Sequence, residues 1–169
     1  MPHPLETVIR NADGFVLIGD SSEDRFPAYS YHAYTTTGKR FYCIDLGGLP
    51  ASRGATKGGK VYHQASELPD DHDDLAIIWV KPHSAARAVD VAHEAGCKRV
   101  WFSFKTGHHD AIAHARELAM EVVEIGRCPI YYLADKPAAC KAHTLMVKAS
   151  GTYRRPPQTE SDRKRRELF

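Results

Sequence analysis

The stretch Phe15-Val-Leu-Ile-Gly-Asp-Ser-Ser22 decides how this chain is expected to fold, together with Arg25 and Tyr29 that follow it. Its apolar residues end abruptly in glycine and small polar residues, after which the pattern becomes helical. A buried first strand that passes through a short loop into a helix has this pattern. Unpaired N–H groups and the positive dipole end at such a helix N-terminus favour an anion. The stretch therefore predicts a site for a nucleotide-like ligand.

Five short apolar segments alternate with helical ones, and each is expected to form a strand. They are rich in Val, Ile, Phe, Trp and Tyr and are mostly apolar throughout, which is typical of parallel strands covered on both faces. The expected strands are Phe15–Gly19, Arg40–Leu46, Leu75–Val80, Arg99–Phe104 and Glu121–Ile125. Alternation of strand and helix predicts an α/β fold, a three-layer sandwich around a five-stranded, mainly parallel sheet.

Helical periodicity predicts the crossovers that parallel strands require. Gly96 follows one of them as a C-terminal cap, and Asp110 is placed to cap the start of another. The expected helices are Pro27–Thr37, Ser84–Ala95, Ala111–Met120 and Lys136–Lys148. Residues Gly47–Gly59 are expected to form a loop, and a short helical turn is expected near Gln64–Leu68.

The composition fits one domain. The chain has 169 residues, of which 43% are hydrophobic and 26% charged, as in an ordinary globular protein. Its net charge of +2 divides into +3 for residues 151–169 and −1 for the rest. We therefore expect a domain over residues 1–150, with no electrostatic footprint for nucleic acid, and a basic tail over 151–169, mobile or lying on the surface from Tyr153 onward. The tail could dock a protein partner.

Targeting and cysteine patterns point to a reducing compartment. No apolar run approaches the roughly 20 residues of a membrane span, and the N-terminus lacks the layout of a signal peptide. The four cysteines, Cys43, Cys97, Cys128 and Cys140, are far apart and form no Cys-x-x-Cys pair, so neither a disulfide framework nor a zinc ribbon is indicated. The expected location is the cytoplasm.

Open parallel sheets bind ligands outside the carboxyl ends of their strands, where the strand order reverses. This rule directs attention to four segments that follow the expected strands. They are Gly19–Arg25, Asp45–Lys60, Lys81–Ser84 and Lys105–His109.

In these segments the chain resembles the small stand-alone CoA-binding proteins, whose Rossmann-like domain is similar to that of succinyl-CoA synthetase. The resemblance covers roughly residues 12–132. The motifs that carry it are Gly19-Asp-Ser21 with Arg25 and Tyr29, Trp101-Phe-Ser-Phe-Lys-Thr-Gly107 and Arg127-Cys-Pro129. Two positions depart from the family pattern: Asp20 stands where alanine is usual, and Asp45-Leu46 where Asn-Pro is usual. An acid at the second position often accepts a ribose hydroxyl in NAD proteins.

The resemblance implies a bound coenzyme A or acyl-CoA. Gly19, Asp20 and Ser21 would offer backbone amides and a hydroxyl to a pyrophosphate, and the forked guanidinium of Arg25 would pair with its oxygens. The alternative for these residues is a tight turn and a solvated charge without a ligand. The other expected ligand-binding residues are Tyr29, Asp45, Lys60, Lys81, Pro82, Lys105, Thr106, Gly107 and Cys128.

Some of these side chains have a specific expected role toward the ligand and an alternative in which they do not contact it. Lys60, with Arg53 and Lys57, could neutralise an adenosine 3′-phosphate, or simply keep a loop soluble. Lys81 and Pro82 would line the adenine or ribose side of the cleft. Cys128 could exchange with the CoA thiol if neighbouring Arg127 lowers its pKa, or it could be an inert buried cysteine.

Lys105, Thr106 and Gly107 open a second candidate anion site at a helix start. The neighbouring His108 and His109 are expected to point their rings in different directions, with no further ligand to complete a metal site, so no metal is expected.

Three functions remain open at this stage. The first is a binding module that holds CoA or acyl-CoA without chemistry of its own, since no complete catalytic constellation is present. The second is an enzyme that uses the same cleft, either an NAD-type oxidoreductase favoured by Asp45 or a thiol- or acyl-CoA-handling enzyme favoured by Cys128. The absence of the three-glycine fingerprint argues against ordinary NAD binding. The third is a subunit or regulator that docks through the basic tail. The first accounts for most of the motifs.

Overall fold

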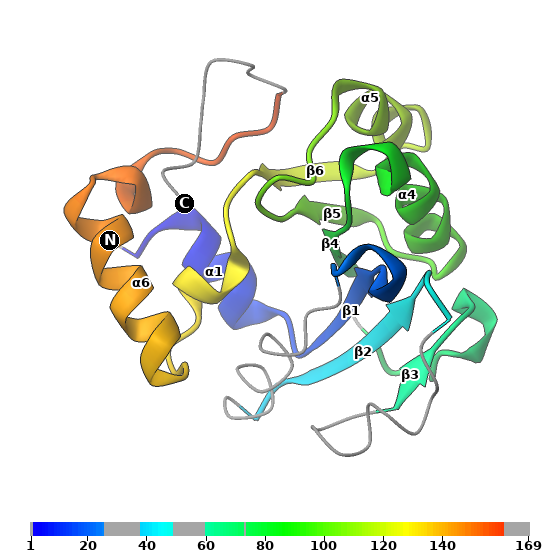
Figure 1. Ribbon diagram of the computed structural model, residues 1–169, viewed down its shortest axis with the longest axis horizontal. Coiled ribbons are helices and arrows are strands. Elements are labelled where there is room, and N and C mark those ends of the chain that lie inside the picture. The colour runs from blue at the N-terminus through cyan, green and yellow to red at the C-terminus, as the bar shows by residue number, and fades with distance from the viewer. Residues whose placement is uncertain (1, 26–37, 49–59, 73, 161–169) are drawn as a thin grey trace.

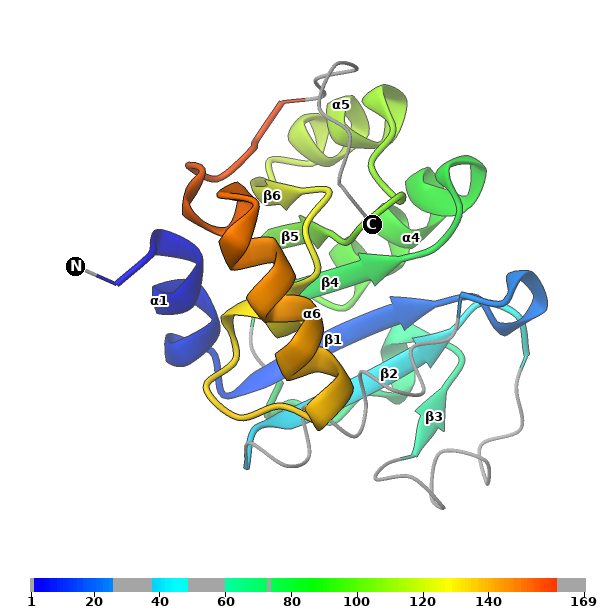
Figure 2. The same ribbon diagram turned by 60° about the vertical axis from the view of Figure 1, so that its left-hand side comes forward.

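The computed structural model describes residues 2–25, 38–48, 60–72 and 74–160. Within these residues the centre is a parallel sheet of six strands in the order β3-β2-β1-β4-β5-β6 (Figures 1 and 2). The strands are β1 (Gly14–Gly19), β2 (Arg40–Asp45), β3 (Val61–Tyr62), β4 (Leu75–Trp79), β5 (Arg99–Phe102) and β6 (Glu121–Ile125). The α/β class and the five expected strands are confirmed. The sixth, β3, was not expected because two residues are too few to show an apolar pattern.

Helices cover both faces of the sheet and complete the three layers (Figure 1). α4 (Ala85–Glu94) and α5 (His109–Glu117) lie on one face, where helices were expected. α1 (Pro4–Asn11) and α6 (Ala138–Ala149) lie on the other. Five short 3-10 helices lie in the described connections: η1 (Ser21–Glu23), η2 (Ala65–Glu67), η3 (Pro82–Ser84), η4 (Pro129–Tyr132) and η5 (Thr152–Arg154). The turn expected near Gln64–Leu68 is η2.

The two helical layers explain why β1 is apolar at every position. All six of its residues are buried. Phe15 and Leu17 pack into the core under α1 and α6, whereas Val16 and Ile18 pack into the core under α4 and α5. A strand between two layers buries both sets of alternating side chains, and each large apolar side chain contributes about 1.5–3 kcal/mol when fully buried. Hydrophobic burial thus fixes β1 at the centre of the sheet.

The helix ends confirm one expected cap and correct another. Gly96 has a φ of +80° and its N–H donates to the carbonyl of His93, so it caps α4 as predicted. The prediction that Asp110 caps the following helix is wrong. α5 begins at His109, the capping position belongs to His108, and Asp110 lies inside the first turn. There an acidic side chain still favours the positive end of the helix dipole.

The first helix, α1, was not expected from the sequence. Its capping residue His3 accepts the N–H of Leu5 through Nδ1 at 3.2 Å, and Pro4 occupies the first helical position. Leu5 and Ile9 are its only buried residues, so the apolar stripe is too short to stand out. Within the described part of the chain, no helix is both long and apolar enough to cross a bilayer.

The C-terminal segment is part of the folded domain as far as residue 160. Tyr153 is buried in the core under α1 and α6, and its ring stacks on Tyr132 at a centroid distance of 4.8 Å. The prediction that a mobile or surface-lying tail begins at Tyr153 is therefore wrong at this residue. Three predicted segments lie outside the described residues. They are residues 161–169, nearly all of the loop expected over Gly47–Gly59, with Arg53 and Lys57, and the helix expected over Pro27–Thr37, with Tyr29.

Candidate functional site

The strand order changes direction between β1 and β4. From β1 the chain builds outward through β2 and β3, and from β4 it builds the opposite way through β5 and β6. Gly19, at the end of β1, is level with Asp45 on one side and with Trp79 on the other. Figure 2 shows the arrowheads of β1, β2 and β4 pointing to the same edge. Ligands of open parallel sheets bind at such a reversal, so this edge is the candidate site.

The turn after β1 is closed by its own backbone. Asp20 and Arg25 form an isolated bridge in which the N–H of Arg25 donates to the carbonyl of Asp20 at 3.0 Å. Between them lies η1, and Asp24 takes a left-handed conformation with a φ of +55°. The carboxylate of Asp20 caps η1 by accepting the amide of Ser22 at 3.0 Å. The result is a compact turn at the carboxyl end of β1.

A second carboxylate reaches this turn from β2. Asp45 accepts the amide of Ser21 at 2.7 Å and its hydroxyl at 2.8 Å. Both Asp20 and Asp45 are buried. Every amide of residues 20–25 donates to an acceptor within the protein, two of them to these carboxylates. A pyrophosphate held by the amide and hydroxyl of Ser21, as the sequence predicts, therefore requires Asp45 to move away.

Gly47 explains how β2 comes so close to the turn. A Cβ atom at this position would lie 2.5 Å from the amide nitrogen of Ser22 and 2.7 Å from Asp20 Oδ1. A Cβ atom essentially never comes this close to an atom to which it is not bonded, so only glycine lets the backbone after β2 pass over η1. The sequence showed Gly47 only as the start of a loop. Its packing role depends on the pairing of β1 with β2.

Arg25 lies against an aromatic pair on the β4 side of the reversal. Its guanidinium carbon is 5.7 Å from the ring centroid of Trp79, whose ring lies 5.4 Å from that of Phe104. The indole Nε1 of Trp79 is buried and has no hydrogen-bond partner among the described residues. A buried donor without a partner costs about 1–3 kcal/mol, which an incoming acceptor would relieve. The sequence analysis did not single out Trp79, because it reads as one more apolar strand residue.

The segment after β4 also meets the turn. Glu23 of η1 pairs with His83 and accepts the hydroxyl of Ser84 at 3.4 Å. The side chain of Ser84 therefore bonds to Glu23 and makes no cap on α4. Lys81 and Pro82 are exposed beside these contacts. The structure thus brings together three of the four predicted segments: residues 19–25, the start of 45–60 through Asp45 and Gly47, and residues 81–84.

The segment after β5 has a packing role that the sequence did not reveal. Thr106 is fully buried, and a Cβ at Gly107 would lie 2.5 Å from Ile125 Cγ2 on β6. Lys105 is exposed and has a φ of +56°, a left-handed conformation that lysine rarely adopts. Close packing of this turn against β6 accounts for Thr106 and Gly107 and leaves Lys105 as its exposed cation.

Lys60 and Cys128 lie apart from the reversal. Lys60 precedes β3 and places its amine 4.7 Å from the ring centroid of Tyr62, level with the middle of β2. Cys128 is partly buried and packs against the core under α1 and α6. The guanidinium of its neighbour Arg127 turns inward to Glu124. Cys128 therefore belongs to the packing under α1 and α6, and Lys60 to the edge strand of the sheet.

Arg127 holds the C-terminal segment to the sheet. It forms a buried bidentate ion pair with Glu124, and it donates to the carbonyls of Arg155 and Pro156 at 2.8 Å each. The amide of Gln158 completes the cluster by donating to Glu124 at 2.9 Å. Burial raises the pKa of Glu124, and the facing guanidinium opposes this rise. In this structure the Arg-Cys-Pro motif thus has an anchoring role.

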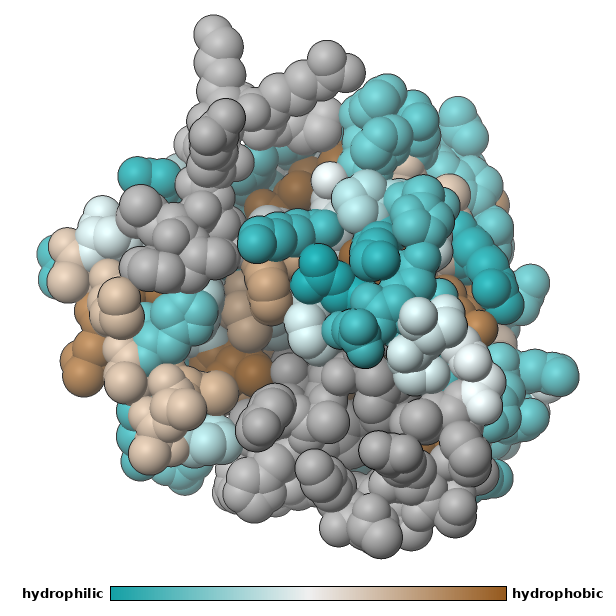
Figure 3. All heavy atoms as spheres, in the orientation of Figure 1, coloured by the Kyte–Doolittle hydropathy of each residue, from teal (hydrophilic) through white to brown (hydrophobic). Residues whose placement is uncertain are grey.

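A cavity of about 670 Å³ lies on the other side of the molecule, between α1, η4 and α6. Lys136 borders it and donates to the carbonyl of Tyr131 at 2.7 Å; burial lowers the pKa of this lysine to about 8. Figure 3 shows apolar side chains over α6 and hydrophilic ones over α4 and α5. Leu145 and Met146 of α6 are 67% and 51% exposed. This cavity is formed by elements other than those at the strand reversal.

The fold and the strand reversal define an α/β protein with a parallel, Rossmann-like sheet. Comparison with protein families matches residues 14–133 to the CoA binding domain, and the chain belongs to that family. The resemblance inferred from the sequence is confirmed.

Solved structures show the same fold. A hypothetical protein from Pyrococcus horikoshii OT3 is 22% identical, with a TM-score of 0.62 over 76% of this chain and 86% of its own. Prb, a protein redesigned for binding, is 23% identical, with a TM-score of 0.61 over the same shares. A conserved hypothetical protein from Pyrococcus furiosus is 21% identical, with a TM-score of 0.54 over 69% of this chain and 96% of its own. No curated protein sequence matches this chain.

Proposed function

We propose that this protein binds coenzyme A or an acyl-CoA at the strand reversal, over the carboxyl ends of β1 and β4, and acts there as a binding module. The observation that carries the proposal is the pair formed by Arg25 and Trp79 at the strand reversal of a chain in the CoA-binding family. A guanidinium that lies on an aromatic ring keeps its edge N–H groups for phosphate oxygens. The indole N–H of Trp79 beside it is buried without a partner among the described residues, and it would be a second donor for a ligand that displaces the groups covering it.

Two buried carboxylates, Asp20 and Asp45, limit how a phosphate group can bind at the turn. Asp45 and Asp20 occupy the amide and hydroxyl donors of Ser21 and Ser22. A diphosphate next to them is repelled, so the side chain of Arg25 carries more of its binding than the backbone does. Lys81 and Lys105, both exposed at the ends of neighbouring strands, add positive charge for the ligand.

Calorimetry with CoA, dephospho-CoA, NAD and NADP tests the proposal. We expect CoA to bind with higher affinity than NAD or NADP. A weaker response to dephospho-CoA would show that the 3′-phosphate is recognised. Arg25→Glu should abolish binding, because it replaces the cation at the turn with a further carboxylate beside Asp20 and Asp45. Trp79→Phe keeps a ring under Arg25 and removes the indole N–H, so it should weaken binding.

Arg154→Glu is the matched control, since Arg154 is exposed and lies in η5, which is not part of the strand reversal. It makes the same charge change and should bind CoA as the parent protein does. Absence of any heat from CoA at high micromolar concentration contradicts the proposal. An equal loss of CoA affinity in Arg25→Glu and Arg154→Glu contradicts the assignment of the site to the strand reversal.

A further inference from the structure

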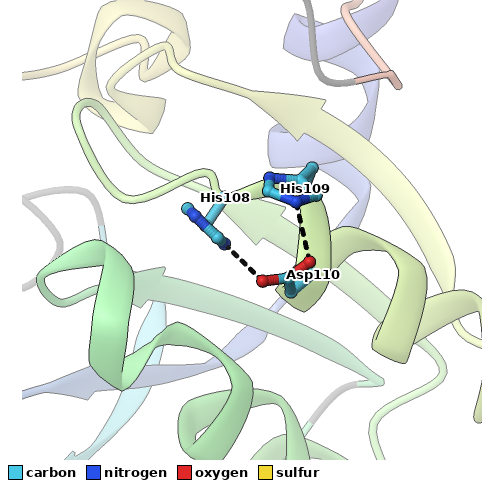
Figure 4. Close-up of side chains that lie close together, drawn as sticks. All are labelled: His108, His109 and Asp110. Atoms are coloured by element: carbon cyan, nitrogen blue, oxygen red, sulfur yellow. Dashed lines mark ion pairs between the residues drawn. The ribbon is translucent and has the colours of Figure 1, made fainter.

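Three side chains at the start of α5 converge on one point. His108 Nδ1 lies 3.4 Å from Asp110 Oδ2, and His109 Nε2 lies 2.8 Å from Asp110 Oδ1. One donor atom from each of the three lies within 4.8 Å of the others. Figure 4 shows a dashed line from each of the two rings to the carboxylate of Asp110. The expectation that the rings point in different directions is wrong, since their centroids are 4.4 Å apart, and Asp110 offers a third donor atom beside them.

The backbone explains why neighbouring histidines meet. His108 is extended, with φ −130° and ψ 142°, whereas His109 is the first residue of α5. Neighbouring side chains diverge within a strand and also within a helix, but here the chain changes from one conformation to the other between them. The preceding turn is held by Gly107 against Ile125. The convergence thus depends on a packed turn as well as on the three side chains.

We propose that His108, His109 and Asp110 form a binding site for a divalent transition-metal ion such as Zn²⁺. Two imidazole nitrogens and a carboxylate oxygen are ligands that zinc binds, with bonds of about 2.0–2.2 Å, which places ligand atoms about 3.4 Å apart around a tetrahedral ion. The contact from His108 Nδ1 to Asp110 Oδ2, at 3.4 Å, has that spacing, and the 2.8 Å contact from His109 Nε2 to Asp110 Oδ1 would lengthen when an ion binds. Imidazole ligands favour such ions over Mg²⁺, which prefers oxygen.

The chemistry of the three ligands is specific. His108 would coordinate through Nδ1 and keep its proton on Nε2, whereas His109 would coordinate through Nε2 and keep its proton on Nδ1. The side chains of His108, His109 and Asp110 are 41%, 52% and 70% exposed. Water or a bound ligand can therefore fill the remaining coordination positions, as in zinc sites that keep an open position. The positive end of α5 opposes a cation, so we expect modest affinity.

The site lies one strand beyond the strand reversal, because α5 follows β5 and β5 pairs with β4. The inference is independent of the proposed function, since its test uses metal ions alone. Without a metal, the same contacts join the Asp110 carboxylate directly to the two imidazoles. The experiment has to separate these two cases.

Calorimetry on the full-length, tag-free protein with Zn²⁺ should show one equivalent bound, and Mg²⁺ should give no heat. Co²⁺ should give the visible absorption of an ion with nitrogen and oxygen ligands. His108→Ala, His109→Ala and Asp110→Asn should each weaken Zn²⁺ binding by on the order of tenfold or more, since even the loss of outer-shell partners has effects of that size. Circular dichroism of each variant checks that α5 remains folded.

His93→Ala is the matched control, because His93 is exposed on α4. It should leave Zn²⁺ binding unchanged. Absence of Zn²⁺ binding by the parent protein overturns the proposal. So does binding that persists in the folded variant lacking all three ligands, or that falls equally in His93→Ala. Specific loss in the three ligand variants supports it, whatever CoA does.

Discussion

Replacing Arg127 with methionine should destabilise this protein more than any surface charge change. Arg127 forms two hydrogen bonds to the carboxylate of Glu124, whose side chain is 0% exposed. It also donates to the carbonyls of Arg155 and Pro156, which holds the C-terminal segment on the domain. Methionine fills a similar volume without charge. The variant thus leaves Glu124 buried with the amide of Gln158 as a remaining donor.

The size of the effect follows from the burial of the pair. Removing one partner of a buried ion pair costs about 3–5 kcal/mol, because the other charge stays buried without compensation. That is on the order of a thousandfold in the unfolding equilibrium. The carbonyls of Arg155 and Pro156 belong to exposed residues that water can reach, so they add little. A loss of this size is a large part of the roughly 5–15 kcal/mol that stabilises a typical domain.

Urea unfolding followed by circular dichroism measures the change, and trypsin cleavage after Arg154 reports release of the segment. Arg99→Met is the matched control, since Arg99 pairs with Asp74 at the surface and should lose at most about 1 kcal/mol. Glu124→Met combined with Arg127→Met should recover most of the loss, because an apolar pair leaves no buried charge. A single variant within 1 kcal/mol of the parent protein, or a double variant no better than the single one, would refute this reasoning.

Three further predictions concern the turn after β1 and the contact between α4 and α5. Asp45→Asn should bind CoA severalfold more tightly in calorimetry, because it removes a negative charge 2.7 Å from the amide of Ser21, while urea unfolding should show a small loss of stability; equal or weaker CoA affinity would count against the role given to this carboxylate. Gly47→Ala should lose about 1–3 kcal/mol in urea unfolding, since its Cβ would lie 2.5 Å from a backbone nitrogen, and an unchanged midpoint would contradict that packing. His114 bonds to Asp90 across α4 and α5 at 2.6 Å, and this hydrogen bond raises the pKa of His114 above its usual value of 6.5. The pair therefore stabilises the fold fully below that usual pKa and loses its effect as the pH rises through the folded pKa; Asp90→Asn should return the pKa measured by NMR toward 6.5, and no change on substitution would exclude the pair.

The strands were predictable because burial on both faces leaves a continuous apolar run. Leu75–Trp79 and Glu121–Ile125 lie within one residue of their expected bounds. Short elements escaped prediction because they have too few buried residues to form such a run. Val61–Tyr62 forms a strand through pairing with β2, and α1 has two buried residues. Local pattern carries little information over so few positions.

The candidate site was predictable in place and less so in chemistry. Gly19 and Arg25 were expected at the carboxyl edge of the sheet, and both lie at the strand reversal. The partners of the turn could not be read from sequence, because Asp45 reaches Ser21 from another strand. Trp79 became notable only when its buried N–H was found without a described partner.

The sequence by itself determined the layered α/β architecture and the family, since periodic burial and short motifs are local properties of the chain. The tertiary structure decided which polar groups meet. It placed Asp45 on the turn after β1, turned Arg127 inward to Glu124, and brought His108 and His109 together on Asp110. These outcomes depend on strand register, on close packing at Gly47 and Gly107, and on a change of backbone conformation at a helix start. Each of these is set by contacts between distant segments or by packing, which no local pattern encodes.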